Sequence, residues 1–262
     1  MSVYARHGPA VRLLYLLQAV AWYTGHLGPA RGDVVLCYHG VPDQERRGFH
    51  RQMRVLARRA RRVHVTFDDA YANILTNALP ALEELGIPAT VFVVPGNLGR
   101  IPAWIDQPGH PDCHERIISF DELVRLAEHP LISIGSHTFS HPRLPGLAPK
   151  ILAAELRDSK HMLERFLDYT VDALALPHGA FDTEVLRAAR EAGYRQVFTL
   201  EPRIVSDDHL DDFLLGRFSM SPDTSLLEFR LTCAGAYAWL QSWRRLIAGV
   251  RHGLRHHAKL EV

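Results

Sequence analysis

Cysteine, net charge and long apolar runs are all scarce in this sequence. The chain has three cysteines in 262 residues, an odd number without close spacing, so we expect no disulfide framework and favour a reducing compartment. Its 30 basic and 29 acidic residues leave a net charge of +1, which gives no support for a nucleic-acid partner. An apolar run at residues 11–23 is too short to span a bilayer, and no clear signal-peptide cleavage site follows it.

The two ends of the chain have helical patterns. Residues 10–24 are predicted to form an apolar helix, within an N-terminal segment of residues 1–30, that packs on the domain or lies on a membrane surface. Residues 226–257 carry tryptophans and leucines on one side and arginines on the other, so residues 223–262 are predicted to be a basic amphipathic extension. A terminal helix packed on the domain is one explanation, and contact with an anionic membrane is the other. We expect a cytoplasmic protein, membrane-associated through its termini, with secretion or a periplasmic location as the alternative.

Short apolar runs alternate with helical patterns through the middle of the chain. Alternation of this kind is typical of a parallel sheet with helices outside it, and about seven units favour a barrel over an open sheet. Residues 31–222 are predicted to form this single barrel domain. The strands are expected at residues 34–38, 63–67, 89–94, 131–135, 172–176, 196–200 and 214–220.

Polar side chains follow several of these strands, and in a parallel barrel the carboxyl ends of the strands form the active face. Asp68 and Asp69 follow one strand, while His137 and His141 follow another. Alone, an Asp-Asp pair is usually a turn or a helix cap, and an isolated HxxxH is usually two surface histidines. Together they suggest a His₂Asp site for a divalent metal, with both imidazoles on one face if the segment turns helically.

The motifs themselves resemble those of a known family. Thr66-Phe67-Asp68-Asp69 and the run from Ser136 to His141 resemble the first two motifs of the polysaccharide deacetylases, the NodB homology domain of carbohydrate esterase family 4. Leu36-Cys37-Tyr38-His39 is similar to the family's opening strand, and residues 175–179 with Phe181-Asp182 are similar to its third motif. The resemblance implies a distorted (β/α)7-type barrel that removes N- or O-acetyl groups from sugars with the help of a metal.

Roles follow from the resemblance by position. Asp68 would be the catalytic base, and Asp69, His137 and His141 would hold the metal, most often Zn²⁺. The backbone N–H of His178 would help to hold the oxyanion of the tetrahedral intermediate.

The sequence departs from the family in three places. Ala70 replaces a glycine that follows the paired aspartates, which suggests an unusual backbone angle there. The arginine that orients the base is absent from its place in the third motif; Arg217 is the best substitute, and a surface arginine without a catalytic role is the alternative reading. No motif supplies the histidine general acid, so His39, His178 and, less plausibly, His209 are the candidates.

The expected function is removal of acetyl groups, mainly N-acetyl, from a sugar, a glycan or a lipid-linked saccharide, with water activated by the metal and Asp68 as the general base. One alternative is a non-catalytic glycan-binding protein of the same fold. The other is a related metal-dependent amidohydrolase that acts on a C–N bond outside sugars.

Overall fold

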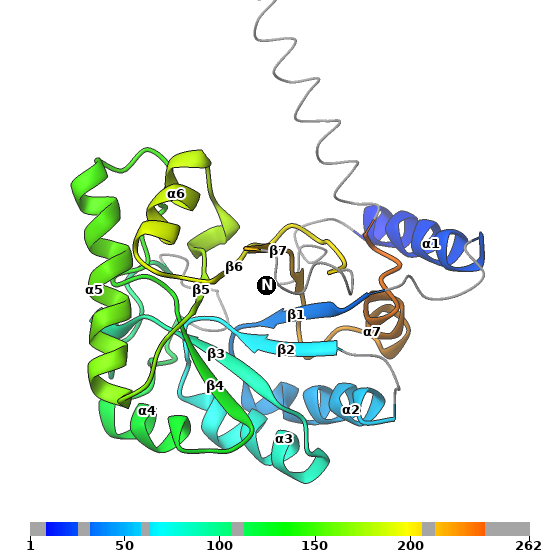
Figure 1. Ribbon diagram of the computed structural model, residues 1–262. Helices are drawn as coiled ribbons and strands as arrows, with labels where there is room; N and C mark the ends of the chain where they lie inside the picture. Colours follow the sequence, from blue (N-terminus) through cyan, green and yellow to red (C-terminus); the bar gives the residue numbers. More distant parts are fainter. Residues whose placement is uncertain (1–8, 26–31, 59–62, 106–112, 206–212, 239–262) are drawn as a thin grey trace, which may run out of the picture.

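The computed structural model describes residues 9–25, 32–58, 63–105, 113–205 and 213–238 (Figure 1). Within them, eight parallel strands form one curled sheet in the order β7-β6-β5-β4-β3-β2-β1-β8. The predicted distorted (β/α) barrel is therefore confirmed. The strands are β1 (Val34–Tyr38), β2 (Val63–Phe67), β3 (Ala89–Val93), β4 (Ile132–Ser136), β5 (Ala173–Ala175), β6 (Gln196–Phe198), β7 (Leu214–Leu215) and β8 (Phe218–Ser219).

The two end strands of the curled sheet, β7 and β8, meet at a seam: they follow each other in the chain, and only Gly216 and Arg217 separate them. Phe198 pairs with Leu215 on one side of the seam, and Cys37 pairs with Ser219 on the other. Prediction of one continuous strand at residues 214–220 was wrong, because the pairing partner changes from β6 to β1 at Gly216 and Arg217. A Cβ on Gly216 would lie 2.4 Å from the carbonyl oxygen of Glu201, so only glycine fits this crossing.

Helices cover the outside of the curled sheet (Figure 1). Helix α4 begins with a capping box: the Glu122 N–H donates to Ser119 Oγ and the Ser119 N–H donates to Glu122 Oε2. A π-helical turn (Ile74–Ala78) leads directly into α3. The covering helices are α2 (Arg46–Leu56), α3 (Leu79–Leu85), α4 (Phe120–Ala127), α5 (Pro149–Leu167) and α6 (Thr183–Glu191).

Alternation along the strands divides the apolar side chains into two layers. Val34, Leu36 and Tyr38 belong to the large cluster shared with the helices. A second cluster contains no helix residue and fills the inside of the barrel. Its buried members are Val35, Phe92, Ala175, Phe198, Val205 and Leu215. These apolar side chains pack the barrel interior below the carboxyl ends of the strands, so the interior is a filled core at this level.

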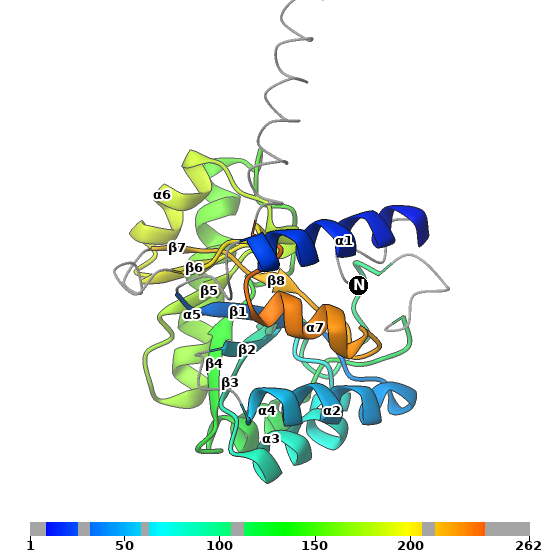
Figure 2. The ribbon, with the colours of Figure 1, turned by 90° about the vertical axis from the view of Figure 1, so that its right-hand side faces the viewer.

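The terminal helices α1 (Pro9–Gly25) and α7 (Leu226–Cys233) lie side by side on the barrel (Figures 1 and 2). Buried Ala19 of α1 and Phe229 of α7 belong to the same core cluster as the strands. The helix predicted for residues 226–257 is shorter than expected: α7 ends at Cys233 and turns follow to Ala238, while the rest of that segment lies outside the described residues. No helix in the described part of the chain is both long and apolar enough to cross a membrane.

Candidate metal and catalytic site

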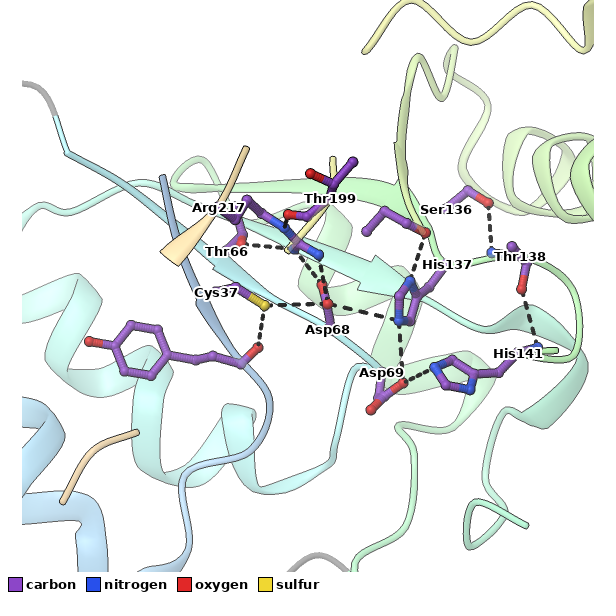
Figure 3. Close-up of polar contacts among 12 residues, drawn as sticks. Cys37, Thr66, Asp68, Asp69, Ser136, His137, Thr138, His141, Thr199 and Arg217 are labelled. Carbon is purple, nitrogen blue, oxygen red and sulfur yellow. Dashed lines mark hydrogen bonds and ion pairs between the residues drawn. The ribbon is translucent and has the colours of Figure 1, made fainter. Parts of the chain in front are cut away.

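Side chains from the ends of β2 and β4 meet at the carboxyl edge of the sheet (Figure 3). Asp69 follows β2, while His137 and His141 follow β4, and all three are buried. His137 Nε2 lies 3.7 Å from Asp69 Oδ1, and His141 Nε2 lies 3.5 Å from the same oxygen. The three ligand atoms lie within 4.8 Å of one another. The structure therefore brings together the three residues predicted as metal ligands.

These spacings fit a bound divalent metal. Ligand atoms about 2.0–2.1 Å from a tetrahedral metal such as zinc lie about 3.4 Å apart, close to the separations seen here. Burial lowers the pKa of both histidines, that of His141 to about 2, so both rings are neutral and can donate a lone pair. Two imidazoles with one carboxylate also leave coordination positions for water and substrate, as catalytic sites require.

The two histidines differ in how their second ring nitrogen is held. His137 Nδ1 lies 2.8 Å from the carbonyl oxygen of Ala175. A carbonyl can only accept, so Nδ1 carries the proton and Nε2 presents its lone pair to the metal position. His141 Nδ1 is buried and has no hydrogen-bond partner among the described residues.

The backbone at the site adopts left-handed angles at residues that carry a Cβ. Ala70 has φ 57°, so the unusual angle predicted from the missing glycine is present, and Asp69 before it has φ 68°. Thr138 and His141 each have φ 65°, so the segment from His137 to His141 is an irregular turn, and the two imidazoles come together without the helical turn considered from the sequence. Such angles cost of order 1–3 kcal/mol each and persist where surrounding structure fixes them at functional sites.

Hydrogen bonds from α5 and from within the turn fix this segment. The Phe139 N–H donates to the carbonyl oxygen of Glu155, and the Ser140 N–H donates to its Oε2. The N–H of His141 donates to Thr138 Oγ1. The backbone of His141 is therefore placed by its own turn and by one glutamate of α5.

Arg217 and Asp68 form a buried ion pair beside the metal triad (Figure 3). Arg217 Nη1 lies 2.6 Å from Asp68 Oδ1, and Nη2 lies 2.8 Å from Oδ2. Arg217 is 0% exposed and also donates to Thr66 Oγ1 and to the carbonyl oxygen of Thr199, which excludes the reading as a surface arginine. Burial alone would raise the pKa of Asp68, but the charge and hydrogen bonds of Arg217 hold it well below its usual range.

Cys37 is a site residue that sequence reasoning missed. Its Sγ lies 3.3 Å from Asp68 Oδ2, and burial raises the pKa of the thiol, so it stays protonated and can donate to the carboxylate. A signal was present in the sequence: Cys37 alternates with the outward-facing Leu36 and Tyr38 and therefore faces the barrel interior. It also pairs in register with Thr66, two residues before Asp68.

The general-acid candidates lie in different surroundings. His39 follows β1; its Nδ1 is buried without a hydrogen-bond partner among the described residues, and burial lowers its pKa to about 3. His178 is exposed, has φ 59°, and its ring lies 5.0 Å from that of His141. His209 lies outside the described residues. Trp104 lies between β3 and α4, and its ring stacks on that of His141 with the ring centroids 4.3 Å apart.

The family model described as "Polysaccharide deacetylase" matches residues 56–197, more than half of the 262 residues. The chain belongs to the polysaccharide deacetylase family. The match contains the aspartate pair and both metal-site histidines. Arg217 lies beyond its end, so the partner of Asp68 comes from a part of this chain that the family match leaves out.

Curated relatives agree with this assignment. The YxkH protein of Bacillus subtilis (strain 168) is 31% identical over 163 residues, which cover 62% of this chain and 53% of that protein. A protein of Staphylococcus epidermidis named poly-beta-1,6-N-acetyl-D-glucosamine N-deacetylase is 27% identical over 172 residues, covering 62% of this chain and 56% of the relative. The chain therefore spans about half the length of the curated relatives it matches.

Solved structures of family members share the fold. IcaB from Ammonifex degensii superimposes with a TM-score of 0.64 and 24% identity, over 80% of this chain and 99% of that one. A Streptococcus pyogenes deacetylase, PplD, in complex with acetate superimposes with a TM-score of 0.63 and 20% identity, over 79% of this chain and 99% of that one. The curled sheet seen here is therefore the fold of known deacetylases.

Proposed function

We propose that this protein is a metal-dependent deacetylase that removes acetyl groups, mainly N-acetyl, from a sugar, a glycan or a lipid-linked saccharide. One observation carries the proposal: the triad of Asp69, His137 and His141 lies beside a carboxylate, Asp68, that is held charged by Arg217. The Staphylococcus epidermidis relative, whose name states N-deacetylation of an N-acetylglucosamine polymer, supports an N-acetylated saccharide as the substrate class.

In this function the metal triad, Asp68 and Arg217 each have a separate role. A divalent metal, which we propose to be Zn²⁺, lowers the pKa of a bound water and polarises the acetyl carbonyl when it occupies the triad. Asp68 accepts the proton of the attacking water, because its Oδ2 lies on the triad side, 3.9 Å from His137 Nε2. Arg217 fixes both carboxylate oxygens and keeps the base ionised at neutral pH.

Breaking the C–N bond needs a proton for the leaving amine. We assign this proton to His39 or His178, which border Asp68 and His141 respectively. Replacing each histidine by glutamine and recording the dependence of rate on pH separates them, since loss of the acid removes the alkaline fall in the profile. We also propose that the backbone N–H of His178 stabilises the oxyanion, on a peptide turned by the positive φ of this residue.

Acetate release from a panel of N-acetylhexosamine oligomers, with and without a chelator, tests the proposal. We expect release that stops on chelation and returns with added Zn²⁺. Asp68→Asn is expected to slow release by about 10²–10⁴-fold while metal content stays unchanged. Asp69→Asn is expected to lose the metal as well.

Three outcomes of this experiment would contradict the assignment. Release by Asp68→Asn at the wild-type rate would remove the carboxylate from its role as base. Oligosaccharide binding without any release would indicate a glycan-binding protein, and release only from non-sugar amides would indicate an amidohydrolase of another substrate class.

We further propose that the protein is cytoplasmic and contacts a membrane surface, where a lipid-linked saccharide would be within reach. Helix α1 supports this proposal because it has no charged residue from Leu13 to Gly25 and presents apolar side chains to solvent. A helix with an exposed apolar face lies favourably in a bilayer interface. The exposed side chains are Leu13, Leu14, Leu17 and Val20.

A further inference from the structure

The two histidines of the triad are oriented by different means. A histidine that binds a metal almost always donates its other ring N–H to an oxygen, which fixes the plane of the ring. His137 does so, through Ala175. His141 does not: its Nδ1 is buried and has no hydrogen-bond partner among the described residues. Some other contact must therefore fix the plane of this imidazole.

Aromatic rings surround His141 within the described part of the chain. The ring of Trp104 stacks on it, with centroids 4.3 Å apart and planes inclined by 21°. His137 and His178 meet it edge-on, at 4.9 Å and 63° and at 5.0 Å and 72°. An edge contact leaves the imidazole free to rock about its Cβ–Cγ bond, whereas a stacked indole opposes this rotation across its whole face.

Trp104 is itself held by the core. It is half-buried and packs against the large apolar cluster that the strands share with the helices. Its ring is therefore a fixed plane between the core and His141, and not a side chain free to follow the imidazole.

We propose that Trp104 is a positioning residue for the metal site. Its indole holds the imidazole plane of His141 so that Nε2 points to Asp69 Oδ1, in place of the missing hydrogen bond. The inference rests on the metal site of the proposed function. It gives a function to the segment between β3 and α4: through Trp104, this segment completes the surroundings of one candidate metal ligand.

Metal affinity distinguishes this task from simple core packing. Loss of a packing residue lowers stability and leaves the metal dissociation constant of the folded protein unchanged. Loss of a positioning residue weakens metal binding and alters the coordination geometry of the metal. Suitable probes are Co²⁺ titration against a competing chelator and the visible absorption of the Co²⁺-loaded protein, which reports coordination geometry.

The experiment compares four purified full-length proteins. Trp104→Leu removes the flat face, and we expect about 10-fold weaker Co²⁺ binding and a changed Co²⁺ spectrum, the low end of the effect of residues around metal ligands. Trp104→Phe keeps a flat ring and is expected to restore affinity to within about threefold of wild type by the same scale. Phe120→Leu is the matched control: Phe120 is 44% exposed and contacts Phe166, so its loss should leave Co²⁺ binding unchanged.

Melting of each metal-free protein shows that the variants are folded. If Trp104→Leu is folded and binds Co²⁺ with wild-type affinity and spectrum, the inference is overturned and the metal site stands. If Trp104→Leu does not fold, Trp104→Phe decides: its smaller ring must still change the Co²⁺ affinity or spectrum measurably, and values equal to those of wild type overturn the inference. Absence of Co²⁺ binding in the wild type would overturn the metal site itself.

Discussion

Arg217 donates two nearly parallel hydrogen bonds to Asp68, at 2.6 and 2.8 Å, although 149 residues separate them in the sequence. Both side chains are buried, and the guanidinium lies over the rings of Phe92 and Phe198 in the barrel interior. Arg217 lies in the seam between β7 and β8, so the segment that carries the chain from one end strand to the other also places the guanidinium against Asp68.

Removing one partner of this pair should be far more costly than removing both. Arg217→Met leaves Asp68 as a buried, unpaired carboxylate, and we expect a loss of about 3–5 kcal/mol in the free energy of unfolding. The double variant Asp68→Leu/Arg217→Met should regain most of that loss, because no charge is left without a partner. Urea unfolding of the metal-free proteins measures both. Additive effects of the two substitutions would contradict a coupled pair.

Thiol reactivity should separate Cys113 from the other two cysteines. Cys37 and Cys233 are buried and Cys113 is half-buried, so a thiol reagent should label one thiol rapidly in the native protein. Burial also raises the pKa of Cys37, which keeps it in the unreactive thiol form. Cys113→Ser should abolish the rapid phase. Rapid labelling that survives this substitution would show that the barrel interior is open to the reagent.

The capping box of α4 should make stability depend on pH at the acid end. Hydrogen bonds from Arg116, with a smaller part from Ser119, lower the pKa of Glu122 to about 2. The pKa of this group is lower in the folded state, so its contribution is fully present above the unfolded pKa of about 4.3 and is lost as pH falls from about 5 towards 2. Glu122→Gln should therefore cost about 1 kcal/mol at pH 7 and less below pH 5. The exposed Glu128→Gln at the other end of α4 is the control, and a gap between Glu122→Gln and wild type that does not narrow with falling pH would refute the linkage.

Co-sedimentation with anionic liposomes tests the membrane contact. Leu13 and Leu17 are each 57% exposed on one side of α1, and glutamine at both should reduce the bound fraction several-fold by removing apolar area from the interface. A second variant lacking residues 240–262 reports on the C-terminal segment separately. Binding unchanged in both variants would rule out attachment through the termini.

Local signals in the sequence were sufficient for much of the fold. The strands at Val34–Tyr38 and Val63–Phe67 begin and end where their apolar runs do, and the capping box at Ser119 is read from residues that contact each other within one turn. The candidate metal triad was predictable for a related reason: Asp69 follows one strand, His137 and His141 follow another, and parallel strands bring their ends to one edge.

Contacts between segments far apart in the chain could not be predicted from the sequence. The interruption at Gly216 arises because the strand changes its neighbour, which no local pattern encodes. Arg217 was proposed as the substitute for the arginine that the family has in its third motif, but its burial and its two hydrogen bonds to Asp68 depend on how distant strands come together in the curled sheet. The stacking of Trp104 on His141 depends on the path of an irregular loop, which has no periodicity to interpret.

The crossing from β7 to β8 also separates the two halves of the candidate site along the chain. Asp68, Asp69, His137 and His141 all precede residue 142, whereas the guanidinium that pairs with Asp68 comes from residue 217. A chain cut before Gly216 would therefore keep all three candidate metal ligands and lose the partner of the proposed base.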